Sequence, residues 1–142
     1  MKLRSLITSL LALAFAGAAF SAELPRTAAP PEAKVYFISP SNGQVIKGDV
    51  TVRFGLVGMG VAPAGTVLEA TGHHHLIIDS PLPALDQPLP KDDTHLHFGK
   101  GQTEVVVKLA PGKHTLQLIL GDANHIPHQP PVVSEKITIT VK

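Results

Sequence analysis

Apolar and polar residues alternate with a period of two along most of the chain beyond residue 33. This is the pattern of β-strands that bury one face. In the stretch HTLQLIL, for example, Leu116, Leu118 and Leu120 share one face. The alternating segments are 34–40, 49–58, 73–79, 95–98, 103–109, 114–120 and 136–142. The 13 prolines and 12 glycines fall largely in the connections, and no segment after residue 22 has the periodicity of an amphipathic helix.

Short strands separated by turn residues predict an all-β fold, an immunoglobulin-like antiparallel β-sandwich of about seven strands. The segment 109–118, LAPGKHTLQL, supports this prediction because it resembles the corner that enters the sixth strand of many such bacterial modules. In that corner a tyrosine hydroxyl bonds to upstream backbone, and His114 takes the position of the tyrosine. We therefore expect His114 to be a structural corner residue.

The first 22 residues have the features of a signal peptide. Lys2 and Arg4 form a basic start, and the apolar run at 6–20 is short for a membrane anchor, which needs roughly 20 apolar residues. We predict a signal peptide at 1–22, a flexible Pro/Ala-rich leader at 23–33 and a β-sandwich domain at 34–142. The mature protein is then expected in the periplasm or secreted, without a membrane anchor.

Charge and cysteine content exclude several classes of function. Removal of Lys2 and Arg4 leaves ten of the 12 basic residues against 11 acidic ones, so the mature net charge is near −1 with neutral histidines. No nucleic acid partner is expected, because nucleic acid binding needs a basic face. The chain has no cysteine, which excludes disulfides, a lipid-attached cysteine and thiolate metal ligands.

Eight histidines fall in four parts of the chain, the first being the stretch GHHHLIID. There, Leu76 and Ile78 are expected to face the core, so His74 shares their face while His73 and His75 point away. Alternate side chains on a strand are about 6.6 Å apart along the chain, and metal–imidazole bonds are about 2.0–2.1 Å, so two such histidines can converge on one ion.

The same alternation applies to the stretch HLHF at 95–98, where Leu96 and Phe98 are expected to face inward. His95 and His97 then share the opposite face. Up-and-down strand order places the start of 73–79, the turn after His97 and the loop 121–133 at one end of the sandwich. That loop carries His125 and His128, whereas His114 is expected at the far end.

A set of histidines gathered at one end suits copper, zinc or nickel. Because Met59 is the only methionine beyond the predicted signal peptide, a methionine-rich copper(I) site is excluded. We predict a transition-metal site, with copper(II) favoured and zinc next. The predicted ligands are His73, His75, His97, His125 and His128, with His74 and His95 as reserve candidates. Four aspartates could be ligands or orient an imidazole: Asp79, Asp92, Asp93 and Asp122.

Long motifs in the chain are similar to those of a family of small exported bacterial domains of unknown function. They are GHHHLIID, HLHFGKGQTE, PGKHTLQLILGDANHIPHQPP and SEKITITV, and the resemblance covers roughly residues 35–142. The resemblance implies an exported, β-rich, histidine-bearing domain, and it implies no activity.

The predicted function is binding, storage or delivery of a metal ion, with another periplasmic protein as a candidate partner. Two alternatives come from other classes. An open coordination position would make the site that of an oxidoreductase-like metalloenzyme. Alternatively, the histidines are structural or respond to pH, and the domain is a non-catalytic interaction module of the cell envelope.

Overall fold

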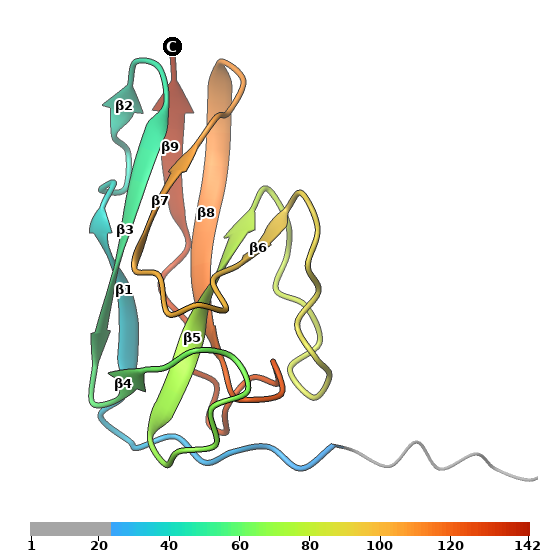
Figure 1. Cartoon of the computed structure of the whole chain (residues 1–142). Helices are drawn as coiled ribbons and strands as arrows, with labels where there is room; N and C mark the ends of the chain where they lie inside the picture. Colours follow the sequence, from blue (N-terminus) through green and yellow to red (C-terminus); the bar gives the residue numbers. More distant parts are fainter. Residues whose placement is uncertain (1–23) are drawn as a thin grey trace, which may run out of the picture.

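The computed structural model describes residues 24–142, which form two β-sheets (Figure 1). The smaller sheet has the order β1-β3-β7. The larger sheet has the order β2-β9-β8-β5-β4, and β6 also pairs with β5. The strand bounds are β1 Lys34–Ser39, β2 Val45–Ile46, β3 Val50–Val57, β4 Gly60–Val61, β5 Thr71–Ile78, β6 His95–His97, β7 Glu104–Val107, β8 Gly112–Gly121 and β9 Ile137–Val141. The predicted all-β sandwich is confirmed.

Strand pairing follows the immunoglobulin-like order. In the smaller sheet β3 lies antiparallel between β1 and β7, and in the larger sheet β8 lies antiparallel between β5 and β9. Each predicted segment contains one strand, although β5 and β8 begin two residues earlier than predicted. The two additional strands, β2 and β4, have two residues each, which is too short to show a periodic pattern.

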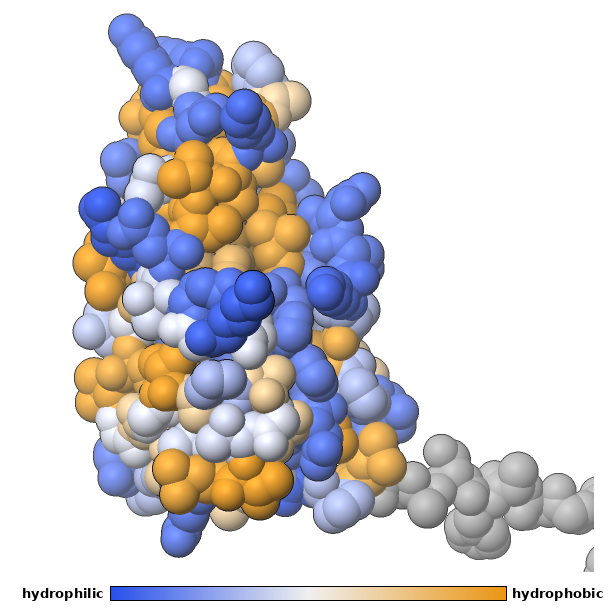
Figure 2. Space-filling view, in the orientation of Figure 1, coloured by the Kyte–Doolittle hydropathy of each residue, from blue (hydrophilic) through white to orange (hydrophobic). Residues whose placement is uncertain are grey.

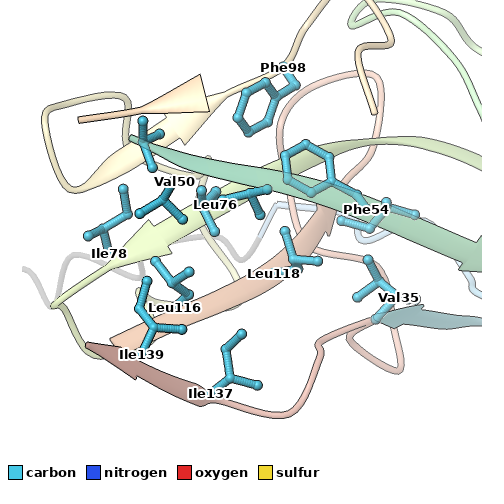
Figure 3. Packing of buried hydrophobic residues seen from close by; sticks show 14 of the residues in the cluster. Val35, Val50, Phe54, Leu76, Ile78, Phe98, Leu116, Leu118, Ile137 and Ile139 are labelled. Atoms are coloured by element: carbon cyan, nitrogen blue, oxygen red, sulfur yellow. The ribbon is translucent and has the colours of Figure 1, made fainter. Parts of the chain in front are cut away.

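Alternate residues of the longer strands meet between the sheets and form the core (Figure 3). Val50, Leu76, Leu116, Leu118 and Ile139 are fully buried there. Burying a side chain of this size stabilises the fold by about 1.5–3 kcal/mol. The predicted inward faces of these strands are therefore correct.

The strand β5 is buried on both of its faces. Leu76 and Ile78 face the main core, whereas Ile77 lies in a second apolar cluster with Leu89 and Ile119. Leu89 belongs to the long connection between β5 and β6, which covers the outer face of the sheet at this point. His73 and His75 share this covered outer face with Ile77, which is why they are buried although they point away from the core.

The segment expected to be a flexible leader makes hydrogen bonds with the loop between β8 and β9. The Ala29 amide donates to the carbonyl of Gln129, and the Gln129 amide donates to the carbonyl of Thr27. The Arg26 guanidinium donates to the carbonyls of Pro127 and His128. The predicted signal peptide at 1–22 lies outside the described residues. Within residues 24–142, no helix is long and apolar enough to cross a membrane.

Candidate metal centre

Four histidine rings from three segments meet on the outer face of the larger sheet. His73 and His75 come from β5, and His97 lies opposite His75 on β6. His125 comes from the loop after β8, and its ring centroid is 5.0 Å from that of His73 and 4.7 Å from that of His97. The centroid of His75 is 4.8 Å from that of His73 and 5.0 Å from that of His97. We call His73, His75, His97 and His125 the four-histidine cluster.

The ring nitrogens are close enough for small side-chain rotations to bring them onto a single metal ion. One nitrogen from each of His73, His97 and His125 lies within 4.8 Å of the others. The Nε2 atoms of His73 and His75 are 3.0 Å apart. Two imidazole nitrogens that bind one ion at about 2.0–2.1 Å are about 2.9 Å apart at a right angle and about 3.4 Å apart at the tetrahedral angle. His75 lies farther from His125, with a centroid distance of 6.1 Å.

The environment keeps the buried rings of the cluster neutral. Burial lowers the pKa of His73 to about 4, with further lowering by the nearby His125 and His97. Burial and the adjacent His73 lower the pKa of His75 to about 2. Burial also lowers the pKa of His97, with His125 as the next cause. Because metal binds the neutral form of imidazole, these three rings need lose no proton at neutral pH before an ion binds.

The hydrogen bonds of the cluster are incomplete. Between the four rings, the one hydrogen bond among described residues joins His73 and His75. The Nδ1 atom of His75 and the Nε2 atom of His97 are buried and have no hydrogen-bond partner in residues 24–142. Buried polar atoms in proteins normally have a partner, and an ion is one explanation for those that lack one. The donor set consists only of imidazole nitrogen, which suits copper, zinc or nickel rather than calcium or magnesium.

Two glycines leave the space that the rings occupy. A Cβ atom at Gly99 would lie 2.3 Å from Cε1 of His97, and one at Gly121 would lie 3.0 Å from Nε2 of His75. Gly121 also pairs with His73 across the sheet. A larger residue at Gly99 would therefore displace a ring of the cluster. Neither glycine was predicted from the sequence. The available signal was the position of each within four residues of a predicted ligand, Gly99 after His97 and Gly121 before His125.

Asp122 organises the loop that carries His125. Its Oδ1 accepts hydrogen bonds from the backbone amides of Asn124 and Ile126, and its Oδ2 accepts one from the hydroxyl of Thr27. The backbone amide of His125 donates to the carbonyl of Asp122. His125 has a φ of 67°, a left-handed conformation that is uncommon outside glycine. The buried Asp122 thus holds a tight turn that directs His125 toward β5.

The structure does not bring His128 into the cluster. Its ring is fully buried, and its Nε2 lies 3.1 Å from the carbonyl oxygen of Thr71. A Cβ atom at Gly72 would touch this ring, which places it beside the start of β5. We leave His128 out of the proposed site because, among residues 24–142, its ring neither packs against the rings of the cluster nor belongs to the group of His73, His97 and His125.

The remaining histidines and aspartates have other neighbours. His74 faces the core, where its ring centroid is 5.1 Å from that of Phe54. His114 lies at the far end, where its Nε2 donates to the carbonyl of Ala110 and its Nδ1 donates to Asp79. This confirms the expected corner. His95 and Asp92 form a pair with an Nδ1–Oδ1 distance of 2.9 Å. Asp93 is exposed.

A family model for a domain of unknown function, DUF4399, matches residues 52–142. The chain belongs to this family. The match confirms the resemblance to a family of unknown function, and the DUF4399 segment contains all eight histidines. No curated protein and no solved structure matches the chain.

Proposed function

We propose that this DUF4399 protein binds one transition-metal ion through the four-histidine cluster, for storage or delivery of that ion in the periplasm or outside the cell. One observation carries the proposal: His73, His97 and His125, from β5, β6 and the loop after β8, each place a ring nitrogen within 4.8 Å of the others. The ring of His75 packs beside those of His73 and His97. His73, His97 and His125 are the principal ligands, and His75 is the fourth. The ion is the cargo of the protein.

The contacts inside the cluster support metal binding over a purely structural role. A structural cluster would satisfy its buried nitrogens with hydrogen bonds, since each unpaired one costs about 1–3 kcal/mol. Here the Nε2 of His97 is buried without a partner among residues 24–142. One ion could engage ring nitrogens from all three segments at once.

The nitrogen-only ligand set favours copper(II) and then zinc. Copper(II) takes tetragonal nitrogen sites with ligands near right angles, and zinc prefers a tetrahedral arrangement. The 3.0 Å separation of the His73 and His75 Nε2 atoms is closer to the right-angle value. Both metals bind imidazole well, so both need to be tested.

The test is calorimetric titration of the protein beginning at residue 23, the first after the predicted signal peptide, with copper(II), zinc and nickel at pH 7.5. We expect one ion per chain and a Kd below about 1 μM for copper(II). Replacement of one principal ligand, as in His73→Gln or His125→Gln, should weaken binding by about 100-fold or more, because even outer partners of metal ligands contribute 10–100-fold.

His114→Gln is the matched control, since it removes a histidine at the far end of the sandwich and should leave the affinity unchanged. Binding no tighter than about 1 mM for all three metals would contradict the proposal. Equal affinity of the wild type and His73→Gln would contradict the ligand assignment. Circular dichroism of each variant would confirm that it is folded.

A further inference from the structure

Beside the four-histidine cluster, His95 has the arrangement of a metal ligand oriented by a carboxylate. It lies on β6 two residues before His97, and alternation places both side chains on the same face of the strand. The Nδ1 atom of His95 is 2.9 Å from Oδ1 of Asp92. Asp92 is held in turn by the backbone amide and hydroxyl of Thr94, which both donate to the same oxygen.

This contact decides which nitrogen of His95 carries the proton. An ionised carboxylate can only accept a hydrogen bond, so the Nδ1 of a neutral His95 ring must carry the hydrogen. The lone pair then lies on Nε2. Carboxylates fix metal-binding histidines in this way, by accepting from one ring nitrogen while the other binds the ion.

The free nitrogen of His95 is accessible. Among residues 24–142, its Nε2 has no hydrogen-bond partner and is not one of the buried unpartnered atoms, and the side chain is 13% exposed. The carboxylate of Asp92 is more exposed still, at 53%. An ion in solution can therefore reach the Nε2 of His95 while Asp92 holds the ring.

One surface hollow is lined by both His95 and His97, together with the apolar Leu96, Phe98 and Val105. It has a volume of about 470 Å³. Asp92, Asp93 and Lys91 line it too, so two negative charges face one positive charge in a space open to cations. Figure 2 shows hydrophilic residues over this edge of the molecule, where β6 and the connection before it lie.

We propose that His95, oriented by Asp92, is a relay ligand that accepts an incoming metal ion and passes it to His97. The proposal rests on the proposed function and adds a route to the same site. The two residues are about 6.6 Å apart along the strand, which two metal–imidazole bonds of about 2.0–2.1 Å and small side-chain rotations can bridge. In the transfer a bond to His97 forms as the bond to His95 breaks, and the ion keeps its charge. Asp92 is a positioning residue.

The test is stopped-flow loading of the metal-free protein with copper(II), followed by removal of the ion with a chelator. A relay ligand affects both directions equally, so His95→Gln should slow loading and removal by a similar factor, about tenfold or more, and leave the Kd and the stoichiometry unchanged. Asp92→Ala should slow both steps in the same way. Asp92→Asn keeps an oxygen that accepts from Nδ1 and should restore part of the rate.

His114→Gln should load at the wild-type rate. The relay is overturned if the wild type binds copper(II) and both His95→Gln and Asp92→Ala load at the wild-type rate. It is also overturned if His95→Gln weakens the Kd in proportion to the rate, because His95 would then be a resident ligand. Absence of copper binding by the wild type would overturn the proposed function and the relay together, so the two failures are distinguishable.

Discussion

At the scale of single residues, Gly99 leaves the space in which the ring of His97 joins the four-histidine cluster. A Cβ at Gly99 would lie 2.6 Å from the Nε2 of His97. The imidazole is the end of a movable side chain, so it can rotate away at little cost to stability, but it then leaves its place in the cluster. Affinity for metal and stability should therefore respond differently to a methyl group at this position.

We expect Gly99→Ala to weaken copper(II) binding by about tenfold or more while lowering the free energy of unfolding by no more than about 1 kcal/mol. Gly60→Ala is the matched control, because a Cβ there would meet its nearest atom at an ordinary 3.5 Å. Calorimetric titration and urea unfolding of the two variants measure both quantities. Unchanged affinity of Gly99→Ala would show that the His97 ring is not held at the site as described.

At the scale of elements, β5 carries three consecutive histidines that are buried on opposite faces of one strand. Burial is the main cause that lowers the pKa of each, to about 4 for His73 and His74 and to about 2 for His75. His74 gains no compensating hydrogen bond among the described residues, since both of its ring nitrogens are buried without a partner. The unfolded chain therefore takes up protons at these positions more readily than the folded strand.

The stability of the metal-free protein should fall as the pH is lowered from 6.5 toward 4. Over this range the unfolded histidines are protonated and the folded ones are not, so the unfolded state is favoured. A pKa lowered from 6.5 to about 4, as for His74, corresponds to a loss on the order of 3 kcal/mol by pH 4. His114 acts in the opposite sense, because hydrogen bonds with Asp79 and Ala110 raise its pKa. Its contribution to the stability of the fold is present at low pH and is lost as the pH rises through the raised pKa.

Urea unfolding of the metal-free protein at several pH values measures this dependence. His74→Leu removes one buried imidazole from the core face, so the variant should be at least as stable as the wild type at pH 7 and lose less stability at pH 5. Equal stability of the wild type at pH 7 and pH 5 would mean that the β5 histidines are not buried as neutral groups.

The sequence predicted the strands and their faces well because alternation reports directly which side of a sheet is buried. It also placed His73, His75 and His97 on one face, which the structure confirms. It could not separate His125 from His128, since both lie in an aperiodic loop. The bonds of Asp122 and the left-handed backbone of His125 make that distinction, and they depend on contacts between distant segments. The space that Gly99 and Gly121 leave for the rings of His97 and His75 likewise depends on the folded arrangement of the chain.

At the scale of the whole molecule, the sandwich separates histidines with different roles. At the far end both ring nitrogens of His114 face acceptors, 2.6 Å from Asp79 and 2.7 Å from the Ala110 carbonyl, so the ring is held as a charged structural group. On the covered outer face near the other end, the four rings of the cluster face each other with incomplete hydrogen bonding. Strands β5 and β6 and the loop after β8 thus assemble one candidate site.

The most direct test of that site is a crystal structure of the copper(II)-loaded protein, with anomalous scattering measured at the copper edge. We expect one strong copper peak per chain, within about 2.0–2.1 Å of ring nitrogens from His73, His97 and His125, with His75 as the fourth ligand. A peak elsewhere on the molecule, or none in this cluster, would contradict it.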